Sequence, residues 1–463
     1  MLKEFCIIGL GLYFALLIFI VAKSKKDSSL LDYFFGGRKL PFWALSISFI
    51  ASWWGAGSAI ATADLAYQDG IGAFWYYGVP VLFATFLITL SAKHIRKIGA
   101  LTQGEIMQSR YSPLVAKILA LMIVIFMTLN AGSQMVALGD FFGAFLGLDY
   151  TLALVVGTSV VLLYSIIGGF KAVILTDILQ FVLLFISALA VFFVALYYSG
   201  GFENIAEVAL SREKQGYTDF FASSGKYFVY VIVFGFSWSI QANVWQRVSA
   251  VKDEGDARKM AIMSFVVFVP LYLIVVFTGM SALPLFETLP EGGAIQAIIL
   301  NYMPPVLAVF VIIGITSAIM STMDSLINTA AMTLVLDLSK FKKASQAKKV
   351  FYSKIATLVL SLIAMFFALN IRSILDLAWI ASDIITTGIF IPLVLGFLWK
   401  RGNTRGAIAS MLWGIAYCSY NFLIFIGIAL PKFWQLQSAS QVIFGVGTSL
   451  ALYIVMSLCK KES

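Results

Sequence analysis

Hydrophobic residues fill the chain in long runs, and charged residues, glycines or prolines stand between them. Each run has about 18 to 30 residues, long enough for a helix that crosses the hydrocarbon core of a bilayer. The pattern predicts an all-α integral membrane protein with about thirteen transmembrane helices in a single transmembrane domain, residues 1–463. They are expected at 5–23, 41–68, 71–92, 114–142, 150–168, 172–198, 227–246, 259–286, 304–336, 350–370, 372–399, 404–428 and 440–459.

Composition and charge support this interpretation. The chain is 61% hydrophobic and 12% charged, which is unlike a soluble protein. Its net charge of +9 would suggest nucleic acid in a soluble protein, but the distribution of the charge indicates a membrane and no nucleic-acid partner. When alternate connections are assigned to one side, only six of the 32 lysines and arginines fall opposite: Lys3, Arg212, Lys214, Lys226, Arg372 and Lys432. The positive-inside rule then predicts a multi-pass plasma-membrane protein with its N-terminus outside and its C-terminus cytoplasmic.

Residues typical of catalysis are sparse. Cys6, Cys418 and Cys459 are isolated and lack metal-ligand or redox spacing, and His94 lies among lysines. No nucleophile elbow, phosphate-binding loop or metal-ligand cluster occurs in the sequence. We therefore expect neither an enzyme nor a catalytic or organic-cofactor site, and we infer no obligate protein partner.

The hydrophobic run 304–336 contains an unusually polar stretch, GITSAIMSTMDS. Polar groups within hydrocarbon need partners, so this stretch must face protein, water or a ligand. Gly314, Ala318, Ser321 and Ser325 follow helical spacing and form one narrow face. That face fits either a close packing seam between helices or a site that offers hydroxyl oxygens.

The order of the helices predicts two related halves. With the extra N-terminal helix 5–23 set aside, ten helices divide into 41–198 and 227–399, and two C-terminal helices follow within 404–459. Five is an odd number, so the halves enter the membrane with opposite orientation, as in transporters with inverted repeats.

In such transporters the site lies between interrupted helices at corresponding positions of the two halves. The first helix of one half carries Gly55 and Gly57 at its middle. The first helix of the other half carries Gly235 followed by several polar residues. Both features permit local unwinding, although ordinary membrane helices also tolerate glycine.

Depth in the membrane places oxygen atoms from two helices near each other. The unwound carbonyls of Ala51 and Trp54, the Ala318 carbonyl, and the Ser321 and Thr322 hydroxyls would make five neutral oxygens near the bilayer centre. A small monovalent cation suits such a set, because it binds oxygen dipoles and can still leave.

Four segments in this order and spacing resemble the sodium:solute symporter family. They are YFFGGRKLPFWALSISFIAS (Tyr33–Ser52), GGFKAVILTDILQ (Gly168–Gln180), QRVSAVKDEGDARK (Gln246–Lys259) and SAIMSTMDSLINTAA (Ser317–Ala331). The resemblance covers nearly the whole chain and includes proline, glucose and choline transporter relatives. It implies a leucine-transporter-like fold with a five-plus-five inverted-repeat core, one helix before it and two after.

The resemblance also implies site residues. The family's sodium positions fall on Ala51, Trp54, Ala318, Ser321 and Thr322. An acidic residue implicated in sodium coupling matches Asp177.

Asp177 lies within a hydrophobic run, and no lysine or arginine stands within one helical turn of it. We therefore expect a passing cation as its partner, together with hydroxyls near Ser321 and Ser325. The alternative is an acid that caps or snorkels at a helix end.

The solute is expected between the two interrupted helices, where an aromatic residue stands in place of an acid. Proline-transporting relatives carry that acid where this chain has Trp53, and ASWWGAG is more similar to choline-transporter relatives. An aromatic ring there could face a quaternary ammonium by cation–π attraction. However, Gln241 stands where those relatives place a tryptophan, and Trp238 lies about a turn away. The expected solute contacts are Ser52, Trp53, Gly55, Asn130, Gln134, Gln241 and Trp379, although each tryptophan could simply pack.

The predicted function is a sodium-coupled symporter that imports a small organic solute by alternating access. Its partners are the solute, the co-transported sodium ion and the lipid bilayer. The solute is left open among amino acids, choline-like cations, sugars and carboxylates. The alternatives are a passive channel or a solute-sensing receptor on the same fold.

Overall fold

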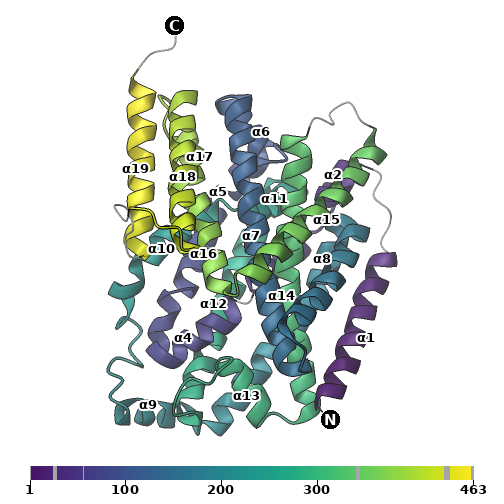
Figure 1. Cartoon of the computed structure of the whole chain (residues 1–463), viewed down its shortest axis with the longest axis vertical. Helices are drawn as coiled ribbons and strands as arrows, with labels where there is room; N and C mark the ends of the chain where they lie inside the picture. The colour runs from purple at the N-terminus through teal and green to yellow at the C-terminus, as the bar shows by residue number, and fades with distance from the viewer. Residues whose placement is uncertain (1, 24–28, 56, 340–344, 432–437, 460–463) are drawn as a thin grey trace.

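The computed structural model describes residues 2–23, 29–55, 57–339, 345–431 and 438–459, and within these ranges the regular structure is helical (Figure 1). The long or membrane-embedded helices are α1 (Leu2–Lys23), α3 (Phe42–Trp53), α4 (Thr62–Asp69), α5 (Gly78–Ile98), α7 (Pro113–Leu146), α8 (Tyr150–Tyr198), α10 (Ser224–Ser239), α11 (Ala242–Ala250), α12 (Glu254–Leu285), α14 (Pro305–Thr333), α15 (Gln346–Asn370), α16 (Ile374–Ile384), α17 (Phe390–Leu398), α18 (Thr404–Phe425) and α19 (Ser438–Leu458). The shorter helices are α2 (Leu30–Phe35), α6 (Gln103–Arg110), α9 (Gly201–Ser211) and α13 (Ala294–Tyr302). The predicted all-α fold is confirmed.

In the described ranges, ten helices are long and apolar enough to cross a membrane, or eleven if the bent pair α10 and α11 is one span. The difference from about thirteen predicted helices comes from merged neighbours. α8 runs for 49 residues, but Gly169 (φ 55°, ψ −161°) divides it into two arms that correspond to the predicted helices 150–168 and 172–198. The predicted helices 41–68 and 71–92 also merge in part, because 57–98 forms one 42-residue candidate span.

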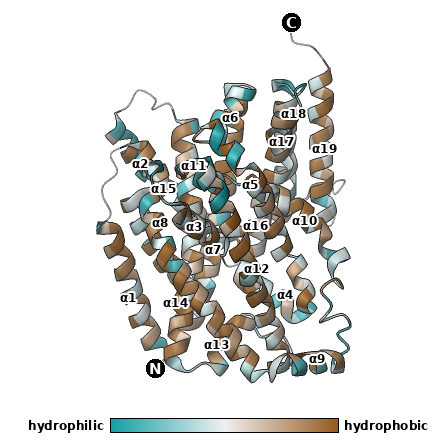
Figure 2. Cartoon of the chain, turned by 180° about the vertical axis from the view of Figure 1, so that it is seen from behind, coloured by the Kyte–Doolittle hydropathy of each residue, from teal (hydrophilic) through white to brown (hydrophobic). Residues whose placement is uncertain are grey.

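The helices form a bundle with an apolar exterior. α14 packs against α8 and α7, and α12 packs against α5. α1 and the pair of α18 and α19 stand on opposite flanks of the view, while α9 and α13 lie along one edge and α6 near the other (Figure 1). Hydrophobic residues cover the outer helices, whereas hydrophilic residues gather at α6 and α9 (Figure 2). Such an exterior fits lipid tails along the bundle and water at its two ends.

Two helix breaks shape the centre of the bundle. α3 ends at Trp53, Trp54 leaves the helical region (φ −95°, ψ 61°), and the chain resumes as a short π-helical turn, Gly57–Ala61, before α4. α10 and α11 meet at a bend of 45°. Both predicted interruptions are therefore present.

The second break falls at Ile240 and Gln241 rather than at Gly235. Gly235 stays helical, and a Cβ atom there would lie 2.3 Å from Cδ1 of Phe83 on α5. This glycine therefore serves close packing between α10 and α5. The Gln103 amide of α6 donates to the Ile240 carbonyl at 2.6 Å, so the carbonyl freed at the break has a partner.

Candidate functional site

A cavity opens between the two helix breaks, and its empty volume, open solvent included, is about 800 Å³. Six of the seven predicted solute contacts line it: Ser52, Trp53, Gly55, Asn130, Gln134 and Gln241. The seventh is Trp379, whose side chain lies outside the part of the chain that the structure describes.

The structure adds residues that the sequence pattern did not single out. Tyr76, Tyr77, Phe234, Asn243 and Ser382 also line the cavity. The two tyrosines come just before α5, in a position that fits an interfacial aromatic belt equally well. The tyrosines precede α5, whereas Trp53 ends α3. Sequence spacing alone could therefore not predict that they line the same cavity.

Aromatic rings meet at one corner of the cavity. The ring centroid of Trp238 lies 6.1 Å from that of Trp53 and 5.1 Å from that of Tyr77. The corresponding ring planes are inclined by 59° and 46°. Phe234 stacks on Trp238 at 4.8 Å with an angle of 10° and supports it from its own helix.

Several polar atoms at the cavity have no partner. Asn243 is fully buried, yet neither its amide nitrogen nor its amide oxygen forms a hydrogen bond within the described residues. Trp53 is 8% exposed as a residue, and its buried indole nitrogen is likewise without a partner there. Leaving buried donors and acceptors unpaired costs about 1–3 kcal/mol each, so these atoms are suited to a ligand or water.

Gly55 allows three elements to approach one another. A Cβ atom there would lie 2.5 Å from Oε1 of Gln134 on α7 and 2.8 Å from Oγ1 of Thr322 on α14. A side chain at this position would displace both groups. The first break is therefore the point at which α3, α7 and α14 meet.

Thr322 joins the first break to α14. Its hydroxyl lies 3.3 Å from the Ala51 carbonyl and 3.2 Å from the Ala318 carbonyl, and the residue also lines the cavity. The structure thus brings together three of the predicted sodium ligands. Trp54 directly follows the end of α3, and among the described residues no hydrogen bond joins its carbonyl to α14.

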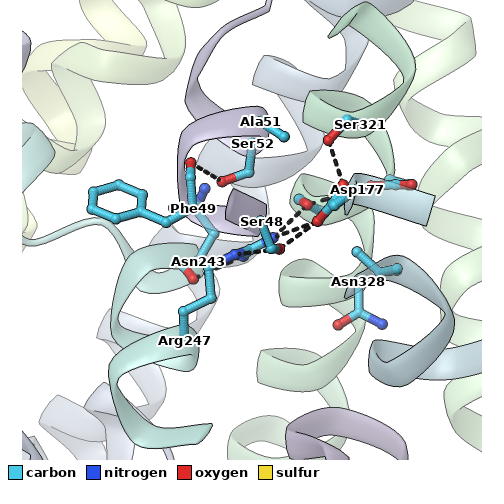
Figure 3. Close-up of polar contacts among 12 residues, drawn as sticks. Ser48, Phe49, Ala51, Ser52, Asp177, Asn243, Arg247, Ser321 and Asn328 are labelled. Atoms are coloured by element: carbon cyan, nitrogen blue, oxygen red, sulfur yellow. Dashed lines mark hydrogen bonds and ion pairs between the residues drawn. The ribbon is translucent and has the colours of Figure 1, made fainter. Parts of the chain in front are cut away.

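Ser321 points to a different partner, the carboxylate of Asp177 on α8 (Figure 3). Ser48 of α3 donates to the same carboxylate, and Arg247 of α11 pairs with it at 3.5 Å. Both ionised side chains are fully buried. Arg247 also donates to the hydroxyls of Ser48 (2.9 Å) and Ser325 (2.7 Å).

The expectation that Asp177 meets no basic side chain is therefore wrong. The prediction considered only neighbours along its own helix, whereas Arg247 reaches it from α11 in the other half of the chain. A guanidinium with five donors can hold a carboxylate and two hydroxyls at once. The sodium-binding role of Asp177 remains a prediction, and any cation there must share the carboxylate with Arg247.

A second buried carboxylate lies beside this cluster. Asp324 accepts a hydrogen bond from the Tyr164 hydroxyl at 2.8 Å and one from Ser325 at 3.3 Å. The polar face of α14 also serves packing, because a Cβ atom on Gly314 would lie 2.0 Å from the Ser187 hydroxyl of α8. This stretch thus packs closely at Gly314 and makes polar contacts from Ala318 onward, and a site on its hydroxyl oxygens stays a prediction.

Comparisons with known proteins agree with this arrangement. The model of the sodium:solute symporter family matches residues 33–414. Relatives include the osmoregulated proline transporter OpuE of Bacillus subtilis (28% identical, covering 98% of this chain and 95% of the relative) and the sodium/pantothenate symporter of Haemophilus influenzae (27%, covering 95% and 93%).

Solved structures share the fold. A sodium-coupled sialic acid symporter in a substrate-bound, outward-open state has a TM-score of 0.81, at 18% identity and with 99% of this chain and 98% of that chain covered. The nucleobase-cation-symport-1 family transporter Mhp1 has a TM-score of 0.59, at 13% identity and with 93% and 94% covered. At these identities the likeness concerns the fold alone.

Proposed function

Because the chain belongs to the sodium:solute symporter family, we propose that sodium and solute bind on adjoining sides of the first helix break. The protein is a sodium-coupled solute symporter of the membrane, and not an enzyme. Sodium is the ion co-transported in this family. The predicted ligands Ala51, Trp54, Ala318, Ser321 and Thr322 would hold it while it passes.

One observation carries this proposal: Thr322 belongs to both regions. Its hydroxyl contacts the carbonyls of Ala51 and Ala318, and the same side chain lines the solute cavity. An ion that gathers these oxygens would draw α14 toward the broken end of α3. That movement would change the cavity wall, which is the physical link that symport requires.

Asp177 would take part in sodium passage as the hydrogen-bond partner of Ser321. Its carboxylate accepts from Ser321, a predicted sodium ligand, and from Ser48 one turn before Ser52 of the cavity. Sodium could replace part of the hydrogen bonding that Asp177 receives. The incoming ion would then meet a carboxylate that is already buried, which lowers the cost of ion entry.

The broken helices would act as corresponding parts of the inverted repeats 41–198 and 227–399. Each repeat has its break in its first membrane helix, at Trp54 and at Ile240. Alternating access would move the helices of this central bundle against the remaining scaffold. α1 starts at one end of the molecule and α19 finishes at the other (Figure 1), so the two helix ends would lie on opposite sides of the membrane. The positive-inside distribution of lysines and arginines supports an outside N-terminus and a cytoplasmic C-terminus.

The sodium ligands are tested by removing two hydroxyls, Ser321→Ala with Thr322→Ala. A buried cation that loses two of its oxygens is under-coordinated, at about 1–3 kcal/mol per group. We expect the sodium concentration that half-stabilises the purified protein against heat to rise at least about tenfold. Thr333→Ala is the matched control, because its hydroxyl bonds to the Thr329 carbonyl of the same helix at 2.9 Å.

An unchanged sodium response in the well-folded double variant would mean that this face of α14 only packs. Uptake into vesicles measures coupling separately: proline, pantothenate and choline are compared in sodium and potassium buffers at one pH. Saturable, sodium-dependent uptake of one solute supports symport. Flux that does not saturate and is equal in both buffers supports the passive channel instead.

A further inference from the structure

The extra N-terminal helix α1 buries one narrow stripe of residues against the bundle. They recur every three or four positions: Cys6, Leu10, Tyr13, Leu17 and Val21. α1 contacts α8 and α14 at the flank of the bundle (Figure 1). Tyr13 is the one residue of the stripe that carries a hydroxyl, and it is only 5% exposed. A buried hydroxyl is normally paired inside the protein, so its partners show what Tyr13 holds.

α14 provides one neighbour of the Tyr13 hydroxyl. A Cβ atom on Gly9, one turn before Tyr13, would lie 2.7 Å from Cγ1 of Val309 and 3.2 Å from Cδ1 of Ile313. α1 therefore approaches α14 closely at this height. The Ser317 hydroxyl, one turn after Ile313 on α14, is a hydrogen-bonding neighbour of the Tyr13 hydroxyl.

α8 provides the other neighbour. The amide nitrogen of Gln180 donates to the Tyr13 hydroxyl at 3.0 Å, and the Gln180 side chain is fully buried. A hydroxyl can accept one hydrogen bond and donate another. Ser317 donates to the Ile313 carbonyl of its own helix at 2.8 Å, so its oxygen can accept from Tyr13. The directions agree: Gln180 donates to Tyr13, and Tyr13 can donate to Ser317.

Both neighbours of Tyr13 lie one turn from the contact between Asp177 and Ser321. Gln180 comes three residues after Asp177 on α8, and Ser317 comes four residues before Ser321 on α14. Residues three or four apart lie on the same face of a helix. Ser321 itself donates to the Asp177 carboxylate. Tyr13 thus joins the same faces of the same two helices, one turn away from that hydrogen bond.

We propose that Tyr13 is a positioning residue for sodium binding: it holds α8 at Gln180 and α14 at Ser317, and thereby sets how far Ser321 lies from Asp177. The inference rests on the proposed function, in which Ser321 is a sodium ligand. Tyr13 would not touch the ion. A binding site keeps its geometry only when the residues around its ligands hold them in place, so a small change in the spacing of the two helices would weaken it. α1 would then serve ion binding although it lies outside the two proposed repeats.

The test is Tyr13→Phe, which keeps the ring and removes the hydroxyl. Heat stability of the purified full-length protein is measured as sodium replaces potassium at constant ionic strength. We expect the sodium concentration that half-stabilises the protein to rise at least about threefold. A merely structural loss would lower the melting temperature in both salts and leave that concentration unchanged, which would overturn the proposal.

Tyr417→Phe on α18 is the matched control. Tyr417 is also a buried tyrosine of a helix outside the proposed repeats, and its hydroxyl donates to the Gln441 carbonyl of α19 at 3.1 Å. Its loss should leave the half-stabilising sodium concentration at the parent value. An equal rise in Tyr13→Phe and Tyr417→Phe would contradict a specific role of Tyr13.

The background Ser321→Ala shows whether Tyr13 acts through Ser321. The ligand that Tyr13 positions is already absent there, so adding Tyr13→Phe should raise the half-stabilising sodium concentration by less than about twofold. A further rise as large as in the parent background would show that Tyr13 acts elsewhere and that the proposal is wrong. If Tyr13→Phe does not fold, Gln180→Met gives the same comparison from α8, because it removes the partner and leaves Tyr13 in place.

The proposed sodium site and the role of Tyr13 can fail separately. If Ser321→Ala with Thr322→Ala weakens the sodium response and Tyr13→Phe does not, the sodium site stands and the positioning role is wrong. If that double variant responds to sodium as the parent does, the sodium site itself is wrong, and the role of Tyr13 at Ser321 is wrong with it.

Discussion

The buried ion pair and the solute cavity contact adjacent turns of α3, through Ser48 and Ser52, but only the polar groups around the ion pair are hydrogen-bonded within the protein. Ser48 donates to Asp177 and accepts from Arg247, within a cluster where each charged group has several partners. Ser52, one turn later, lines a cavity in which the Asn243 amide has none among the described residues. The polar groups of the first region are paired within the protein and those of the second are not, which separates side chains that stabilise the fold from side chains suited to a ligand.

The largest loss of stability is expected when the charge of Asp177 is removed from the ion-pair cluster. Asp177→Asn keeps the size of the side chain but replaces one accepting oxygen with an NH2 donor and leaves the Arg247 guanidinium without its carboxylate, which costs about 3–5 kcal/mol. We expect a clear loss of heat stability and of folded yield in detergent, together with weaker sodium dependence.

The double variant Asp177→Asn with Arg247→Met separates charge pairing from ion binding. It should recover much of the lost stability, because the Arg247 charge is removed together with that of its partner, but it should not recover sodium dependence. Recovery of both properties would show that Asp177 is structural only. Full stability in Asp177→Asn alone would contradict the ion pair.

The next effect concerns the boundary between the two regions. Gly55→Ala would place a methyl group 2.5 Å from the Gln134 amide oxygen and 2.8 Å from the Thr322 hydroxyl. Overpacking of this kind costs about 1–3 kcal/mol, and here it displaces the cavity residue Gln134 and the proposed sodium ligand Thr322 together. We expect affinities for both sodium and solute to fall, as measured by binding to purified protein. Gly11→Ala on α1 is the control, since nothing lies within 4 Å of its added methyl group; a change in only one affinity would contradict a shared boundary.

The sequence predicted the parts of this arrangement that depend on local pattern. Hydrophobic runs located the membrane helices, and the Gly55 region located the first break, because an apolar span and an interrupting glycine are visible within a single segment. Six cavity residues followed from the same pattern once the two breaks were assumed to face each other.

The parts that it missed are contacts between segments distant in the chain. Arg247 stands 70 positions from Asp177, and its own segment reads as a polar helix end rather than as a buried partner. The sequence offered Gly235 as a point of unwinding, whereas the second break lies at Ile240 and Gln241. Close packing against Phe83, and not backbone freedom, explains that glycine. Burial and pairing of this kind are properties of the assembled bundle.

A smaller effect is expected from Ser48→Ala. Ser48 is fully buried, donates to Asp177 and accepts from Arg247 at 2.9 Å, so its loss leaves two charged groups each short of one partner. We expect destabilisation of about 1–3 kcal/mol, measured by denaturation in a lipid nanodisc. Ser91→Ala is a suitable control because that hydroxyl bonds only to carbonyls of its own helix, at 2.8 and 3.3 Å. Equal losses of stability in Ser48→Ala and Ser91→Ala would show that the Ser48 hydroxyl contributes no more than a hydroxyl bonded only to its own helix.

The smallest change in stability should come from Asn243→Leu, in the region that lacks partners. Leucine is close to asparagine in shape, and neither amide atom gives up a hydrogen bond within the described structure, so stability without solute should shift by no more than about 0.5 kcal/mol. Solute binding should be affected far more, because the solute loses the donor and the acceptor of the Asn243 amide. Its affinity should fall about tenfold or more. Denaturation without solute and binding with solute, measured on one preparation, give the two numbers. A variant that loses stability as Ser48→Ala does, and binds solute as the parent does, would show that Asn243 has partners of its own and that the contrast between the two regions is not real.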